Sequence, residues 1–115
     1  MISFECFNAD NFLITIRGRS IHPGTAKGQL ANPVRIAADI VRQWPEDRLP
    51  ESTEGYEGFA LFAEIQADEE LASIAGIVRD FDLEQFQEHK ALLEAIVKAT
   101  RLKYPLAEIN VSFSE

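Results

Sequence analysis

The sequence is poor in the residue types that most often build metal and disulfide sites, with one cysteine, Cys6, and two histidines in 115 residues. A single cysteine excludes an internal disulfide and a zinc site made of several thiolates, and it fits a reducing cytoplasm. Cys6 alternates with Ile2 and Phe4, a pattern that favours a buried structural thiol over a reactive one. We therefore expect a cytoplasmic protein whose cysteine has a structural role.

Positive charge is also scarce, with 11 Lys and Arg against 19 Asp and Glu and a formal net charge of −8. This balance repels phosphate backbones, so we expect no nucleic acid partner. Long apolar runs are absent, and Glu5 and Asp10 interrupt the first apolar segment, so we expect neither a membrane span nor a signal peptide. The remaining composition, 46% hydrophobic and 26% charged, is typical of one globular domain.

The first part of the chain shows the alternation of half-buried strands. Ile2, Phe4 and Cys6 alternate with polar residues, and so do Phe12, Ile14 and Ile16. Residues 8–11 between them read NADN, which is typical of a turn. The pattern predicts a hairpin of two strands with its turn at 8–11.

A helix is predicted from Pro33 to about Trp44, because Asn32 can cap it and Pro33 suits its first position. Arg35 and Asp39 are spaced to pair on its exposed side. The apolar stripe expected to face the sheet has helical spacing and consists of Val34, Ala37, Ala38 and Val41.

Two strands are predicted at 59–67 and 71–80, joined by the acidic turn at 68–70. Asp82 and Gln85 resemble a capping box, which predicts a second helix as far as Tyr104. A final strand follows, in which Ile109, Val111 and Phe113 alternate.

The resulting order is β, β, α, β, β, α, β. Without the first strand it is the split βαββαβ arrangement. We therefore predict an α+β, ferredoxin-like sandwich in one domain of residues 1–115, with two helices on one face of an antiparallel sheet and an extra N-terminal strand. This fold hosts many functions, so it does not by itself indicate an activity.

Few residues are candidates for chemistry. The histidines, His22 and His89, lie in separate elements and have no metal-ligand spacing, so we expect no metal site in this chain. His89 in the second helix is interpreted as a solvated or partly packed side chain. Arg79, at the end of a strand, could bind a carboxylate or pair with Asp80 or Asp82. Capping alone explains Asn32.

Three motifs then indicate a family. Residues 20–28 read SIHPGTAKG and are followed by Asn32, residues 53–59 read TEGYEGF, and residues 78–82 read VRDFD. In order and spacing they resemble the peptidase T branch of the M20 metallopeptidase family, over nearly the whole chain. The resemblance implies the lid and dimerisation domain of a homodimeric tripeptide aminopeptidase, excised from a larger two-domain chain whose catalytic domain holds two zinc ions. This piece alone would be inactive.

The resemblance also implies roles for three residues. His22 would reach the catalytic site of the other protomer and stabilise the oxyanion formed when water attacks the peptide carbonyl. Arg79 would bind the terminal carboxylate of the peptide substrate, and Asn32 would contact the substrate backbone while capping its helix. It implies no role for residues 53–58. Two alternatives stay open: the lid of another M20 peptidase or amidohydrolase, and a ferredoxin-like module that binds a ligand or partner without catalysis.

Overall fold

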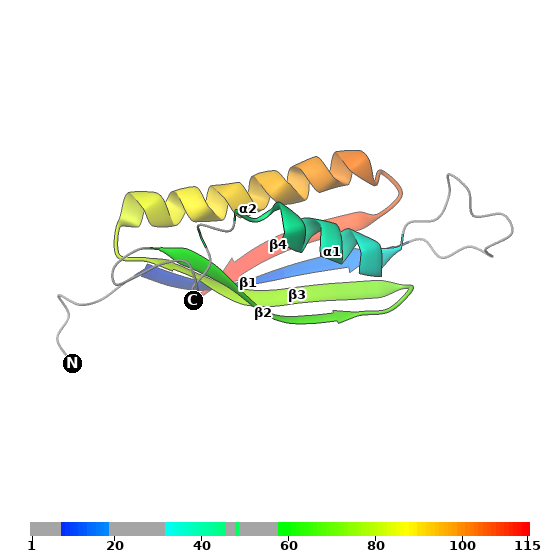
Figure 1. The fold of residues 1–115 in the computed structure, drawn as a ribbon, viewed down its shortest axis with the longest axis horizontal. Coiled ribbons are helices and arrows are strands. Elements are labelled where there is room, and N and C mark those ends of the chain that lie inside the picture. Colours follow the sequence, from blue (N-terminus) through cyan, green and yellow to red (C-terminus); the bar gives the residue numbers. More distant parts are fainter. Residues whose placement is uncertain (1–7, 19–31, 46–47, 49–57) are drawn as a thin grey trace, which may run out of the picture.

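The computed structural model describes residues 8–18, 32–45, 48 and 58–115. Two helices lie on one face of a four-stranded sheet whose order is β2-β3-β1-β4 (Figure 1). All neighbouring strands are antiparallel, so the predicted βαββαβ sandwich is confirmed. Its elements are β1 (Asn8–Arg17), α1 (Pro33–Gln43), β2 (Phe59–Ala67), β3 (Leu71–Asp80), α2 (Leu83–Lys103) and β4 (Glu108–Ser114).

The predicted turn at residues 8–11 is wrong, because β1 begins at Asn8 and runs through these residues without a break. They pair with β3 from Asn8 opposite Asp80 onward. The Asn8 side chain donates to the carbonyl of Asp80 at 3.2 Å, and Lys90 binds the Asp10 carboxylate at 2.6 Å. Tertiary partners therefore satisfy polar side chains that in sequence are typical of a turn. The extra strand predicted at residues 2–6 lies outside the described residues.

Helix α1 begins and ends as predicted, but a different stripe of it faces the sheet. Val34 and Val41 are 47% and 37% exposed. The expected Arg35–Asp39 pair is also absent among the described residues, since Asp39 binds Arg42 and Lys103 instead. The buried side of α1 consists of Pro33, Ile36, Ala37, Asp39 and Ile40.

Helix α2 begins where its cap predicts. The Asp82 carboxylate accepts the backbone N–H groups of Glu84 and Gln85 at 2.8 and 3.2 Å. The backbone N–H of Asp82 donates to the Asp80 carboxylate at 2.9 Å, so Asp80 takes the place that a capping box gives to Gln85. The start of α2 is thereby joined to the end of β3.

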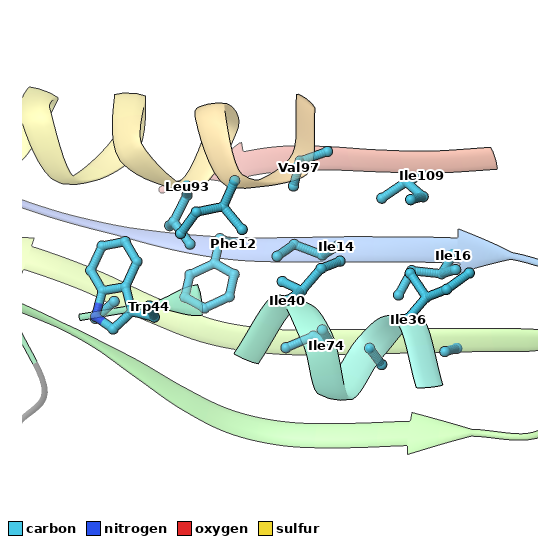
Figure 2. Packing of buried hydrophobic residues seen from close by; sticks show 14 of the residues in the cluster. Phe12, Ile14, Ile16, Ile36, Ile40, Trp44, Ile74, Leu93, Val97 and Ile109 are labelled. Atoms are coloured by element: carbon cyan, nitrogen blue, oxygen red, sulfur yellow. The ribbon is translucent and has the colours of Figure 1, made fainter. Parts of the chain in front are cut away.

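The core fills the space between the sheet and the two helices (Figure 2). Ile14 and Ile74 face each other across β1 and β3, both fully buried. Ile40 and Leu93 cover them from α1 and α2. Neither helix in the described part of the chain is long and apolar enough to cross a membrane.

Both described helices lie on one face of the sheet, so neither covers the opposite face (Figure 1). This opposite face carries exposed apolar side chains. Leu61 and Ile77 are direct neighbours on β2 and β3, and Leu13 lies on the same side of β1. These three residues are 40%, 37% and 42% exposed. We call this the open face.

Candidate functional site

Arg79 lies on the open face, one residue before the end of β3. It pairs with Ala9 of β1 and with Phe59, the first residue of β2. The guanidinium carbon lies 4.9 Å from the centre of the Phe59 ring, so the side chain is held against an aromatic surface. A guanidinium in this setting has the shape and charge to bind a carboxylate through two parallel hydrogen bonds.

Asn32 caps α1, as its sequence position predicts. Its Oδ1 accepts the backbone N–H of Val34 at 3.0 Å, and the residue is exposed. The amide nitrogen points to no partner among the described residues, which leaves a donor for another molecule. His22 lies outside the described residues.

The structure does not bring Arg79 and Asn32 together. Figure 2 shows Ile36 of α1 beside Ile16, and Trp44 at the other end, near Phe12. Asn32 precedes Ile36 and so lies beyond that end of β1, whereas Arg79 pairs with Ala9 near the opposite end. With a rise of about 3.3 Å per residue, the two positions are on the order of 20 Å apart along the sheet.

A buried hydrogen-bonded pair that the sequence did not reveal lies on the side of β3 opposite to Arg79. His89 of α2 and Asp80 of β3 are 6% and 2% exposed, and Nε2 of the imidazole lies 2.9 Å from Oδ2 of the carboxylate. Of the two interpretations offered for His89, a solvated or a partly packed side chain, the solvated one is therefore wrong, because the side chain is packed in the interior. Trp44 packs beside it with ring centres 6.2 Å apart.

Arg48 fixes the tautomer of this histidine. Its Nη1 lies 3.2 Å from Nδ1 of His89. A guanidinium can only donate, so Nδ1 accepts, and the proton sits on Nε2, which donates to Asp80. The indole N–H of Trp44 donates to the carbonyl of Arg48 at 2.9 Å and holds that residue in place. The neutral imidazole thus links a cation to a buried carboxylate.

No sequence pattern marks this pair. Asp80 and His89 are nine positions apart and lie in different elements, so neither strand nor helix periodicity relates them. One sequence signal is related to the pair, namely the glycine at position 58. Its backbone packs so closely against Asp80 and His89 that no side chain fits there.

A second polar cluster joins the far end of α2 to α1. Asp39, 9% exposed, accepts hydrogen bonds from Lys103 at 2.9 Å and Arg42 at 2.7 Å, and from the Tyr104 hydroxyl at 3.3 Å. The hydrogen bond from Lys103, followed by that from Arg42, lowers the pKa of the Asp39 carboxyl. This cluster lines a cleft of about 310 Å³ and ties the two helices together.

In the described part of the chain, no three His, Cys, Asp or Glu side chains lie close enough together to bind a metal ion. The residues present there do not fit the zinc ions that the family resemblance implies.

Comparison with known proteins agrees with the fold and the motifs. Residues 4–105 match the profile of the peptidase dimerisation domain of M20 peptidases. The chain is 40% identical over 114 residues to peptidase T of Geobacillus thermodenitrificans, an alignment that covers 99% of this chain and 28% of that protein.

Two solved structures share the fold. A tripeptidase from Staphylococcus aureus superposes with a TM-score of 0.71 at 16% identity, over 93% of this chain and 29% of the other. A dinuclear metal-binding peptidase of the M20 family from Bacillus subtilis superposes with a TM-score of 0.66 at 17% identity, over 94% of this chain and 26% of the other. The chain thus spans little more than a quarter of these relatives, and it belongs to the family of M20 peptidase dimerisation domains.

Proposed function

We propose that this chain is the lid and dimerisation domain of a zinc-dependent aminopeptidase that releases the N-terminal residue of tripeptides in the cytoplasm. The observation that carries the proposal is the 40% identity to a peptidase T along 99% of the chain. Since the chain corresponds to 28% of that protein, the catalytic machinery belongs to the rest of a longer parent chain. In this proposal the chain is a single domain of that parent.

The metal ions belong to the parent's catalytic domain. A related M20 peptidase of the same fold is described as dinuclear, and the described part of this chain has no cluster of ligands. The contribution of this chain is therefore to bind and orient the peptide, to stabilise developing charge and to exclude water.

Arg79 binds the C-terminal carboxylate of the substrate. It lies on the open face, where no described helix blocks access, and the Phe59 ring limits the directions in which its guanidinium can lie. Leu61 and Ile77 extend an apolar surface beside it. A fixed cation at one end of a closed site measures peptide length, because only a peptide of matching length reaches both the cation and the catalytic centre.

Asn32 and His22 serve a different active site from that of Arg79. Asn32 lies at the opposite end of the sheet from Arg79, and the family resemblance assigns His22 to the active site of the partner protomer. In this proposal one domain supplies Arg79 to its own catalytic domain, and His22 with Asn32 to that of the partner protomer. His22 donates an N–H to the oxyanion, and Asn32 donates its amide N–H to the substrate backbone.

The homodimer forms through edge strand β2 and the neighbouring side of α1. Val34 and Val41 are seven residues apart, nearly two turns, so they lie on one side of α1. Asp39 and Gln43, which bind Lys103 and Thr100 of α2, lie on the other side. The valines therefore face away from α2. Helix α1 also contacts β2, where Ile65 is 51% exposed. An apolar strip beside a strand edge that no other described strand pairs with favours association with a second copy.

The test is release of the N-terminal residue by the full-length parent from a tripeptide, a dipeptide and a tetrapeptide, with and without a chelator. We expect chelator-sensitive, tripeptide-selective release. Activity on the dipeptide alone, or on an acylated amino acid, would assign the parent to another M20 branch. An inactive parent that binds a small ligand would support the non-catalytic alternative.

The role of Arg79 is tested with Arg79→Ala on a tripeptide and its C-terminal amide. The variant should lose use of the free acid and leave use of the amide near the wild-type level. Arg17→Ala is the matched control, since Arg17 is also an arginine on the open face, at the far end of β1. Equal losses on the acid and the amide would show that Arg79 is structural.

A further inference from the structure

The last pairs of the sheet hold Arg79. On one side it faces Ala9, and on the other it faces Phe59, the first residue of β2. The end of a strand opens more readily than its centre, because fewer hydrogen bonds and packing contacts must be broken to free it. A residue that holds a ligand at the end of a strand therefore needs contacts besides those of the sheet to keep its backbone in place.

The Asp80–His89 pair supplies contacts to this place from four directions. Asp80 binds the α2 imidazole through Oδ2 and the N–H of Asp82 through Oδ1. Its carbonyl accepts from the Asn8 side chain, so β1 is joined as well. On the other side of the imidazole, Arg48 brings in the chain that follows α1.

Gly58 brings β2 to the same point. A Cβ on Gly58 would lie 2.0 Å from Oδ2 of Asp80 and 2.6 Å from Nε2 of His89. The backbone just before Phe59 therefore packs directly on the Asp80–His89 pair. The second glycine of the TEGYEGF motif, Gly58, thus has a structural reason. It allows the chain to pass close to the pair and begin β2 at Phe59, directly opposite Arg79.

We propose that the buried Asp80–His89 pair is the positioning unit of Arg79, setting the orientation in which its guanidinium meets the substrate carboxylate. The inference rests on the proposed function. His89 and Asp80 face the helices and do not reach the open face, so they act through the backbone of residues 79–80 and through Phe59. They are positioning residues, and no chemistry is assigned to them.

Three variants of the full-length parent test the proposal. His89→Leu removes the donor to Asp80 and the acceptor for Arg48. His89→Gln keeps an amide N–H near the position of Nε2 and so retains the donor to Asp80. Thr100→Val is the matched control, because it removes a buried hydroxyl of α2, bonded to Ile96 and Gln43, at the other end of the helix.

Each variant is assayed on a tripeptide acid and its amide, with KM and kcat measured separately. We expect His89→Leu to raise KM for the acid about tenfold, the scale of a misplaced binding group, with kcat and the amide little changed. His89→Gln should recover most of this loss. Thr100→Val should lower the unfolding temperature without changing the ratio of the two KM values.

An unchanged acid-to-amide ratio in a folded His89→Leu enzyme would overturn the proposal, and so would equal changes in His89→Leu and Thr100→Val. If His89→Leu does not fold, Arg48→Met is measured instead; a shift of the ratio supports the proposal and no shift overturns it. The proposed function fails separately, since in that case Arg79→Ala would itself leave the ratio unchanged.

Discussion

At Gly58 the chain passes so close to Asp80 and His89 that even a methyl group has no room. The nearest atoms belong to a buried carboxylate and a buried imidazole, which cannot move aside without breaking their 2.9 Å contact. We therefore expect Gly58→Ala to lower the free energy of unfolding by about 2 kcal/mol, within the range for overpacked sites. Urea denaturation of the chain measures this difference.

An Asp80→Ala background separates this clash from other effects of alanine. Removing the carboxylate opens the space that the new methyl group needs, so Gly58→Ala should cost less there than in the wild type. Equal costs in both backgrounds would show that the glycine is required for another reason, such as its backbone conformation.

Asp39 makes part of the free energy of unfolding depend on pH. The hydrogen bonds from Lys103 and Arg42 lower its pKa in the folded chain. A carboxyl lowered in this way contributes stability at pH values above its unfolded pKa of about 4, and the contribution is lost as the pH falls through the lower folded value. Asp39→Asn should therefore destabilise the chain at pH 7 and converge with the wild type at strongly acidic pH.

The size of this effect is modest because solvent screens the cations, whose side chains are 61% exposed for Lys103 and 72% exposed for Arg42. We expect a difference on the order of 1 kcal/mol at pH 7. Thermal unfolding of both proteins from pH 7 down to pH 2 measures it. Parallel curves over this range would contradict the assignment.

Among the elements, α1 gives the clearest prediction about assembly. If Val34 and Val41 lie in the dimer surface, a charge at both positions should weaken it without affecting the core, since both side chains are already partly exposed. We expect the parent carrying Val34→Asp and Val41→Asp to shift from dimer to monomer in sedimentation equilibrium.

Leu102 supplies the control for this experiment. It is an exposed apolar residue of α2, 79% exposed, and lies on the other helix. Leu102→Asp should leave the dimer intact. A dimer that survives the double valine substitution would move the interface elsewhere, with the β4 edge as the next candidate.

Helix α1 also shows how much of the fold could be predicted from the sequence. The bounds of α1, β2, β3 and α2 follow from caps, prolines and alternation, and these are confirmed. The buried side of α1 does not follow, because two overlapping stripes share one spacing: Val34 with Val41, and Pro33 with Ile36 and Ile40. Only the position of α2, which binds Asp39 and Gln43, decides between them.

Long-range pairing explains the other differences. Asn8 and Asp10 favour a turn locally, but Asp80 and Lys90, more than seventy positions away, satisfy them within a strand. His89 gives no signal for the same reason, since Asp80 and Arg48 reach it from other elements. The roles of His22, Asn32 and Arg79 stay predictions. The following experiment tests those of His22 and Arg79.

For the whole molecule, the placement of Arg79 and Asn32 at opposite ends predicts complementation. Neither a His22→Ala nor an Arg79→Ala parent should use tripeptide acids well. In a mixed dimer, the catalytic domain of the His22→Ala protomer has its own Arg79 and the partner's His22, so one of its two sites is complete. Random mixing of the two variants should restore about a quarter of the wild-type activity, since half the dimers are mixed.

Activity of the mixture equal to the mean of the two variants would show that His22 and Arg79 act within one protomer. Metal content, measured on each variant, serves as the control: His22→Ala should lower kcat by about 10²–10³ while retaining its metal, as expected for the loss of an oxyanion donor.

Finally, β1 and β4 lie side by side, with Asn11 opposite Ser114. The first residues of β1 and the last residues of β4 therefore lie next to each other at one end of the sheet. If this chain acts as the proposed lid, a load applied at this end is shared by two strands joined through hydrogen bonds. The β1–β4 ladder would then move as one unit when the lid opens and closes.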